Sequence, residues 1–392
     1  MSSQKKAIII IPTFNERENI GKVIPLLLEE REHVAKDWNL QVLVVDDTSP
    51  DKTYEVVEEL TKKYKGVLHL LVNPKKSGLG GAYLKGMAMA FDELGADAVF
   101  EFDADLSHDP TKIPLFLQAL DQGADMVLGS RYIPGGSIPQ DWGLHRKFLS
   151  VVGNIVIAIV FTNFSVRDWT SGYRAITKEV YDAVHPELHS ERFSGYTFQI
   201  GFLHTAIRKG FKVFEVPFHF IDRTIGTSKI GPEYIKNNLM YIFKVRAKEI
   251  YQHRVFRFAF VGGIGAVIQL LSLALYRMIL PDFAVSVLTS FMLATFLSIE
   301  TAIVSNFLIN NVWTFSDKKL SGAALPWKFL QFNLASFGSI LIQLVVAALG
   351  ELLIGIRPLF IIDTGTIFAV VGILIGMFWN FFAYTRLIWK TK

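Results

Sequence analysis

Four long apolar segments in the second half of the chain constrain its fold more than any other feature. Each is close to the ~20 residues that a helix needs to cross a bilayer. They are Phe258–Leu280, Val285–Ile309, Phe329–Ile354 and Ile361–Phe382. The sequence therefore predicts an all-α transmembrane domain of four helices over residues 257–392, in a multi-pass integral membrane protein.

The basic residues around these segments predict the orientation of the chain. They gather before the first segment, between the second and third, and after the fourth: Lys244, Arg246, Lys248, Arg254, Arg257, Lys318, Lys319, Lys328, Arg386, Lys390 and Lys392. The opposite loops carry little besides Asp282, Arg357 and Asp363. Because Lys and Arg are enriched in cytoplasmic loops, we expect the first half of the chain and both termini to lie in the cytoplasm.

The second and fourth segments end alike. Asn306-Phe307 leads to Trp313, and Asn380-Phe381 leads to Trp389. A duplicated two-helix unit explains this pattern, but aromatic residues also recur at membrane interfaces because they anchor helices there. Both interpretations stay open.

The first half of the chain has the pattern of an α/β domain. Short apolar runs alternate with amphipathic stretches over residues 1–230, which predicts βαβ units around a mostly parallel sheet. The predicted strands are Ala7–Ile11, Val42–Val45, Val67–Val72, Ala98–Phe102, Met126–Leu128 and Val213–Ile221. The predicted helices are Asn19–Arg31, Thr53–Lys65 and Gly80–Leu94. Residues 231–256 and the apolar run Phe148–Phe161 are expected to form interfacial amphipathic helices.

The composition limits the possible chemistry. The chain has no cysteine, which excludes disulfides, thiolate metal sites and cysteine nucleophiles, so any metal must use oxygen or imidazole ligands. The formal net charge is only +4, and the basic residues of the first half are interleaved with acidic ones. Nucleic-acid binding is therefore not expected.

Polar residues follow nearly every predicted strand. Ligands bind beyond the carboxyl ends of the strands in open α/β sheets. The first strand runs into Pro12–Glu16, and the second runs into Asp46 and Asp47, which suit the ribose and base of a nucleotide. Ser49 and Asp51 follow, and they serve either the same site or the N-terminus of the next helix.

Asp103-x-Asp105 is the most specific of these features. The two carboxylates directly follow the strand Ala98–Phe102. They can share one Mg²⁺ or Mn²⁺ with substrate phosphates, because such ions keep few protein ligands. Ser107 and His108 are candidates for further ligands, but His108 also suits a helix cap or a solvent-facing position.

Basic residues form the next constellation. Arg131, Arg146, Lys147, Arg223 and Lys229 lie in Gly- and Pro-rich surroundings typical of loops. The stretch from Arg223 to Lys229 combines two cations, two hydroxyls and a glycine, which favours an anion-binding loop. The stretch from Lys75 to Gly81 lacks the spacing of a P-loop and is interpreted as a flexible loop beside the nucleotide.

Several of these stretches resemble, in order and spacing, the dolichyl-phosphate mannose synthases of the family 2 glycosyltransferases. They are IPTFNERENI, VVDDTSPDKT, KKSGLGGAYLKGM, FDADLSHDP, GSRYIPGG, WTSGYRAI, GYTFQI and VPFHFIDRTIGTSK. The resemblance covers about residues 6–245. The membrane half, with NFLINNVWTF, resembles the GtrA-like domain of some archaeal and bacterial members.

The resemblance implies a GT-A fold, GDP-mannose as donor, dolichyl phosphate as acceptor, Mg²⁺ or Mn²⁺, and inversion at the anomeric carbon. By position, the nucleotide would contact Pro12, Phe14, Glu16, Val45, Asp46 and Asp47. The residues implied around the metal and diphosphate are Asp103, Ala104, Asp105 and Ser107. The residues implied toward the donor and acceptor phosphates are Arg131, Arg146, Arg223 and Lys229, and Gln199 lies near the expected acceptor region.

Two departures from the family pattern matter. Phe14 stands where a Tyr is common, which removes a hydroxyl near the nucleotide. Ser107 stands where some members carry a Gln ligand, which leaves the third protein ligand of the metal open.

The charge of a phosphate acceptor supports this chemistry independently. A lipid phosphate is already anionic near neutral pH, its second pKa being about 6, so cations are needed more than a base. The predicted catalytic residues are therefore four cations, Arg131, Arg146, Arg223 and Lys229. They are joined by Asp105, a predicted ligand of the metal. The alternatives are transfer of another sugar from a UDP donor to the same class of lipid, and a carrier or flippase role for the membrane half.

Overall fold

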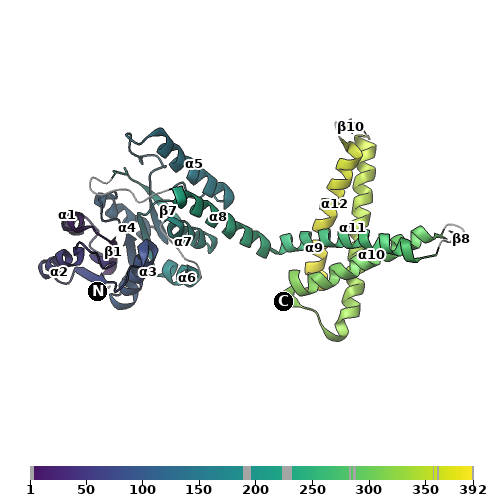
Figure 1. Cartoon of the computed structure of the whole chain (residues 1–392), viewed down its shortest axis with the longest axis horizontal. Coiled ribbons are helices and arrows are strands. Elements are labelled where there is room, and N and C mark those ends of the chain that lie inside the picture. Colours follow the sequence, from purple (N-terminus) through teal and green to yellow (C-terminus); the bar gives the residue numbers. More distant parts are fainter. Residues whose placement is uncertain are drawn as a thin grey trace. The chain divides into compact units, whose positions relative to one another are not determined.

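The computed structural model describes residues 4–188, 196–222, 232–281, 284–285, 288–355, 357–359 and 362–390. The chain divides into two compact units, Met1–Arg246 and Ala247–Lys392. We call them the N-terminal unit and the C-terminal unit. Figure 1 labels elements of both units.

A seven-stranded sheet forms the centre of the N-terminal unit (Figure 1), in the order β3-β2-β1-β4-β6-β5-β7. The strands are β1 (Lys5–Thr13), β2 (Trp38–Asp46), β3 (Leu68–Val72), β4 (Ala98–Glu101), β5 (Met126–Ser130), β6 (Arg174–Thr177) and β7 (Val213–Pro217). Only β6 runs against its neighbours β4 and β5. The mostly parallel sheet was predicted, whereas β6 was not.

Helices cover both faces of this sheet, because its central strands are apolar on both sides. In β1, Ile8 and Ile10 pack on one face, while Ala7, Ile9 and Ile11 pack on the other. The first face is covered by α3 (Gly78–Ala88), α5 (Leu144–Val160), α6 (Lys178–Leu188), α7 (Tyr196–Arg208) and α8 (Pro232–Gln252). The second is covered by α1 (Arg17–Glu29), α2 (Thr53–Lys63) and α4 (Ile113–Asp121).

Three local predictions need correction. The strand expected over Val213–Ile221 ends at Pro217, and a bridge between Ser137 and His219 continues the pairing beyond it. Residues 232–252 form the single helix α8 where several were expected. Arg146 and Lys147, expected in a loop, lie in the first turn of α5, which begins at Leu144.

Among the described residues of the C-terminal unit, four helices are long and apolar enough to cross a membrane. They are α9 (Arg254–Ile279), α10 (Ser290–Ile309), α11 (Leu325–Leu353) and α12 (Thr364–Ala383). Two-residue strands join α9 to α10 (β8, Ala284–Val285, with β9, Leu288–Thr289) and α11 to α12 (β10, Pro358–Leu359, with β11, Ile362–Asp363). The π-helical turns η4 (Asn310–Thr314) and η7 (Tyr384–Ile388) end the two hairpins. This repetition supports the duplicated two-helix unit.

Gly86 lies where α3 packs closely against β1 and β2. A Cβ atom at Gly86 would lie 2.6 Å from Ile10 Cγ2 and 3.0 Å from Val45 Cγ2. Gly86→Ala is therefore expected to destabilise the fold by about 1–3 kcal/mol through overpacking, measured as a lower melting temperature of the full chain in detergent. Gly153→Ala in α5 is the matched control, because nothing lies within 4 Å of its Cβ position. It is expected to stabilise by up to about 1 kcal/mol, and equal effects of the two changes would contradict this packing.

Candidate active site

The loops that follow the parallel strands lie at the carboxyl edge of the sheet and carry most of the predicted site residues that the structure describes. The first two carboxylates there, Asp46 and Asp47, are bonded within the protein. Asp46 is fully buried and accepts hydrogen bonds from Thr13 Oγ1 (2.8 Å), Ser49 N (2.8 Å) and Ser49 Oγ (2.6 Å).

Asp47 joins the loop after β3 to the start of α3. Its carboxylate accepts hydrogen bonds from Asn73 Nδ2 (2.6 Å), Ser77 N (2.9 Å), Ser77 Oγ (2.9 Å) and Gly78 N (3.0 Å). Asp46 and Asp47 thus shape the loops around the candidate site, and their contact with a nucleotide stays a prediction.

Ser49 and Asp51 serve the local fold. Ser49 Oγ accepts a bond from Asn15 N (3.0 Å), and Asp51 accepts bonds from Thr53 N (3.0 Å) and Arg17 N (3.1 Å) at the starts of α2 and α1. Burial alone would raise the pKa of Asp51, but the bonds from Thr53 and Arg17 outweigh it and lower this pKa. Of the two interpretations of Asp51, the structure supports the one at the helix terminus.

The residues after β1 differ in what they can present to a ligand. Pro12 and Phe14 are half-buried, and Lys76 Nζ lies 3.4 Å from the centre of the Phe14 ring. Glu16 accepts a bond from Asn19 Nδ2 (2.7 Å) in the first turn of α1. Val45 needs correction, because its side chain lies in the core beside Gly86 and only its backbone can line a nucleotide.

Asp103 and Asp105 stand in the tight turn that follows β4. Tyr83 Oη donates a bond to Asp103 Oδ1 (3.3 Å), and Ser107 N donates one to Asp105 Oδ1 (3.1 Å). The turn requires a positive φ of 60° at Leu106. The side chain of Asp103 is 40% exposed, whereas Ala104 and Ser107 are buried.

His108 packs against this turn and bonds its backbone. It is buried, and its ring stacks on Tyr173 with 4.9 Å between ring centres. Burial lowers the pKa of His108 against the opposing effect of Asp103 and Asp105. Its Nδ1 accepts a bond from Asp103 N (3.1 Å), so the proton of the neutral ring is on Nε2, 3.7 Å from Asp103 Oδ2. A cap or a solvent-facing position is therefore wrong for His108, and it supports Asp103.

The donor set of this turn fits a hard divalent cation that is shared with a ligand. In the part of the chain that the structure describes, no group of three or more His, Asp or Glu side chains could hold a metal alone. Mg²⁺ commonly binds one or two carboxylates and completes its shell with phosphate oxygens and water. Asp103 and Asp105 match that requirement, while Ser107 is 3% exposed and offers little surface to an ion.

A buried ion pair lies at the end of β4, directly before this turn. Glu101 and Arg174 are both fully buried, with 3.8 Å between Glu101 Oε2 and Arg174 Nε. Arg174 also donates to the carbonyl oxygens of Ser171 (2.8 Å) and Gln199 (2.7 Å). Burial raises the pKa of Glu101 to about 7 although the Arg174 guanidinium opposes the shift. Gln199, expected near the acceptor, is only 3% exposed and belongs to this buried layer.

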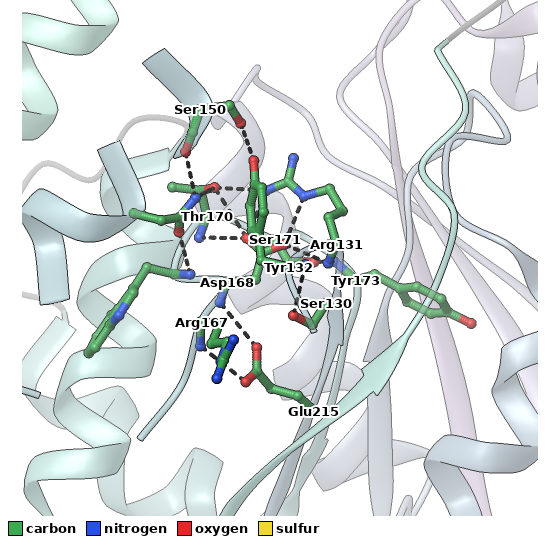
Figure 2. Close-up of polar contacts among 12 residues, drawn as sticks. Ser130, Arg131, Tyr132, Ser150, Arg167, Asp168, Thr170, Ser171, Tyr173 and Glu215 are labelled. Carbon is green, nitrogen blue, oxygen red and sulfur yellow. Dashed lines mark hydrogen bonds and ion pairs between the residues drawn. The ribbon is translucent and has the colours of Figure 1, made fainter. Parts of the chain in front are cut away.

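Arg131 follows β5 and pairs with Asp168 (Figure 2). The Arg131 Nε and Nη2 atoms each lie 2.7 Å from an Asp168 oxygen, and Nη2 also donates to Thr170 Oγ1 (2.8 Å). Burial alone would raise the pKa of Asp168, but the charge and hydrogen bonds of Arg131 outweigh it and lower this pKa. Arg131 is thus held in one orientation at the edge of the sheet.

Arg146 also pairs with a carboxylate, that of Asp222. Its Nη1 and Nη2 atoms donate to Asp222 at 2.8 and 3.0 Å, and Trp142 Nε1 donates to the same carboxylate at 2.7 Å. The guanidinium carbon lies 3.8 Å from the centre of the Trp142 ring. Arg223 and Lys229, the other predicted phosphate ligands, lie outside the described residues.

Comparisons with known proteins show the family of the chain. Residues 8–184 match Glycosyl transferase family 2, and residues 257–389 match the GtrA/DPMS transmembrane domain. A dolichol-phosphate mannosyltransferase of Pyrococcus furiosus is 31% identical over 87% of this chain and 89% of its own length. The chain belongs to the dolichol-phosphate mannosyltransferase family. The predicted fold class, an α/β GT-A-like glycosyltransferase domain followed by four transmembrane helices, is confirmed.

Other relatives are shorter or more distant. The polyprenol monophosphomannose synthase of Mycolicibacterium smegmatis is 37% identical over 62% of this chain and 86% of its own length. The glucosyl-3-phosphoglycerate synthase of Mycobacterium tuberculosis aligns with 62% of this chain and 80% of its own at 17% identity. The TM-score of this alignment is 0.46.

Sequence reasoning missed four charged residues of this dolichol-phosphate mannosyltransferase family member: Glu101, Asp168, Arg174 and Asp222. Glu101 left a detectable signal, because a charged residue inside the apolar run Ala98–Phe102 requires a buried partner. Asp168 and Asp222 left none, because each meets its arginine from a distant part of the chain. Asp168 is 37 residues from Arg131, and Asp222 is 76 residues from Arg146.

Asp168 makes the stability of this family member depend on pH. Its folded pKa is below the unfolded value of about 3.9, so its stabilisation is complete above that value and is lost as pH falls through the folded pKa. The melting temperature of Asp168→Asn is therefore expected to lie furthest below that of the native chain near pH 7, with a gap that narrows below about pH 4. A gap that stays constant down to about pH 3 would contradict the ionised pair.

Proposed function

We propose that the chain transfers mannose from GDP-mannose to dolichyl or another polyprenyl phosphate, with inversion at the anomeric carbon. The observation that carries this proposal is the Asp103-x-Asp105 turn at the carboxyl end of β4 in a member of the dolichol-phosphate mannosyltransferase family. The names of the two curated relatives support mannose as the sugar and a polyprenyl phosphate as its acceptor.

Asp103 and Asp105 are proposed to hold Mg²⁺ or Mn²⁺ against the diphosphate of the donor. The cation would stabilise the charge that develops on the departing nucleoside diphosphate. Tyr83 bonds the Asp103 carboxylate and His108 bonds the Asp103 backbone, while the Asp103 side chain is 40% exposed. This arrangement is preorganised, which reduces the reorganisation required when the donor binds.

The acceptor phosphate is proposed to attack the sugar without a protein base. It is anionic near neutral pH, since its second pKa is about 6. His108 is buried and bonded to the Asp103 backbone, which makes it unsuitable as a base. The task left to the chain is to bring two anions together, and Arg131, Arg146, Arg223 and Lys229 are proposed to do so. Direct displacement by the phosphate oxygen inverts the anomeric carbon.

Two helices are proposed to bring the N-terminal unit to the membrane surface. On α5, Leu144, Phe148, Ile155 and Ile159 lie on one face and are largely exposed. On α8, Ile235, Leu239 and Phe243 repeat this pattern. Exposed apolar faces on amphipathic helices are typical of helices that lie in the headgroup region. The long lipid tail of the acceptor could then stay in the bilayer while its phosphate reaches the site.

The site assignment is tested by transfer of labelled mannose from GDP-mannose to dolichyl phosphate, using the full chain in detergent. Asp105→Ala is expected to lower kcat at least about 100-fold because it removes a ligand that acts on the leaving group. Chelation of divalent ions is expected to abolish product, and Mg²⁺ or Mn²⁺ to restore it. Asp121→Asn is the control, because Asp121 bonds Lys5 and Trp38 at the opposite end of β1 and β2. Product from a UDP-sugar but not from GDP-mannose would overturn the donor.

We propose that the N-terminal unit and both termini lie in the cytoplasm, as the positions of the basic residues predict. Labelling of single cysteines tests this orientation, since the native chain has no cysteine. Lys319→Cys lies between α10 and α11, and Arg357→Cys lies between α11 and α12. In intact cells, a membrane-impermeant maleimide is expected to label position 357 and to reach position 319 only after permeabilisation. The reverse pattern would place the N-terminal unit on the outer side.

A further inference from the structure

The Arg131 side chain is held by an unusual number of bonds to one carboxylate. Besides the two side-chain bonds, the backbone N of Arg131 donates to Asp168 Oδ2 at 3.1 Å. Asp168 is fully buried, and the Arg131 side chain is 9% exposed. Because one carboxylate binds both the backbone N and the guanidinium of Arg131, it fixes the positions of both ends of the side chain.

Asp168 is itself held by a second carboxylate, on β7. Glu215 Oε1 accepts a bond from Asp168 N (3.1 Å), and Glu215 Oε2 accepts one from Arg167 N (3.0 Å), as Figure 2 shows. β7 pairs with β5 so that Glu215 is opposite Leu128, close to the end of β5 that carries Arg131. The sheet therefore sets the position of Glu215, and Glu215 sets the loop that carries Asp168.

Helix α5 holds the same loop from the other side. Asn154 Oδ1 accepts a bond from Trp169 N (2.7 Å), and Asn154 Nδ2 donates to Ser150 O (2.8 Å). The hydroxyls of Tyr132 and Ser150 are 2.5 Å apart. The loop is thus fixed between a strand and a helix, which are the most rigid supports that a fold offers to a functional group.

We infer that Asp168 is a positioning residue for the transfer reaction, which fixes the Arg131 guanidinium in the site, and that Glu215 positions Asp168. This inference rests on the proposed function, in which Arg131 faces the substrate phosphates. A guanidinium carries five N–H donors on a rigid plane, so a carboxylate bonded to one edge determines where the others point. Errors of about 1 Å in such a group can cost about 100-fold in rate.

Stability alone does not account for this arrangement. A buried ion pair usually contributes little more to stability than well-packed apolar residues of the same size would. Here Asp168 bonds both the backbone and the side chain of Arg131, and Glu215 bonds the two backbone amides of the loop that carries Asp168. Their shared geometric effect is to orient Arg131.

Asp168→Asn is the decisive variant. Asn keeps the shape of the side chain but replaces one of the two acceptor oxygens with an NH2 donor, which meets an N–H donor of Arg131, so the two-point hydrogen bonding that orients the guanidinium is lost. We expect kcat for mannosyl transfer to fall about 100-fold, with a smaller change in KM for the donor. Glu215→Gln keeps one acceptor for the two amides and is expected to lower kcat about 10-fold. Asp121→Asn, the same chemical change in a bonded carboxylate at the opposite end of the sheet, is expected to stay within about twofold.

A double-mutant cycle separates positioning from a merely structural role. If Asp168 acts through Arg131, then Asp168→Asn combined with Arg131→Lys is no slower than the slower single variant. Melting temperatures of all variants are measured alongside, and if Asp168→Asn does not fold, Glu215→Gln and Arg131→Lys with their combination decide the question in the same way.

Two results would overturn the inference: an Asp168→Asn enzyme that keeps more than about half of the native kcat, or losses that multiply in the double variant. Failure of the proposed function is a separate result. If the native chain uses a UDP-sugar and not GDP-mannose, the donor assignment fails, while the same ratios of variant to native rate, measured with the active donor, still test the inference.

Discussion

The cost of burying charge at the carboxyl edge of the sheet governs the architecture of the N-terminal unit. Arg131, Asp168, Glu101 and Arg174 are nearly or fully excluded from water, and an unpaired charge in such a place would be strongly unfavourable. Each must therefore meet a partner from another part of the chain. Those partners sit on β4, β6 and the loops after β5 and before β6, so satisfying the charges also closes the loops that form the site.

This constraint also separates two kinds of acidic residue that look equivalent in the sequence. Asp46, Asp47 and Asp168 have their oxygens occupied by protein donors and act as supports. The Asp103 side chain is 40% exposed, although Tyr83 donates a bond to its Oδ1 and His108 accepts one from its backbone N. A divalent cation shared with a diphosphate needs carboxylates of the second kind.

Much of this could be predicted from local patterns. The apolar runs of β1, β2 and β4 were recognisable from the pattern of neighbouring residues, and the four spans were recognisable from the length of their apolar segments. β6 was missed because Arg174–Thr177 is four residues long and runs antiparallel in a mostly parallel sheet. Val45 was assigned to the nucleotide although its side chain packs under Gly86, since the face on which a strand residue lies depends on what covers the sheet. Arg146 was expected in a loop and lies in the first turn of α5.

The sequence by itself determined the fold class, the membrane-spanning half, the Asp103-x-Asp105 turn and the family, because each depends on spacing or order along the chain. Only the tertiary structure decided that Asp168 orients Arg131, that Asp222 clasps Arg146, and that Glu101 is buried against Arg174. These pairs join segments that are 37, 76 and 73 residues apart. The two members of each pair come together only when the sheet forms. A charged side chain that loses its water there is stable only beside a group of opposite charge.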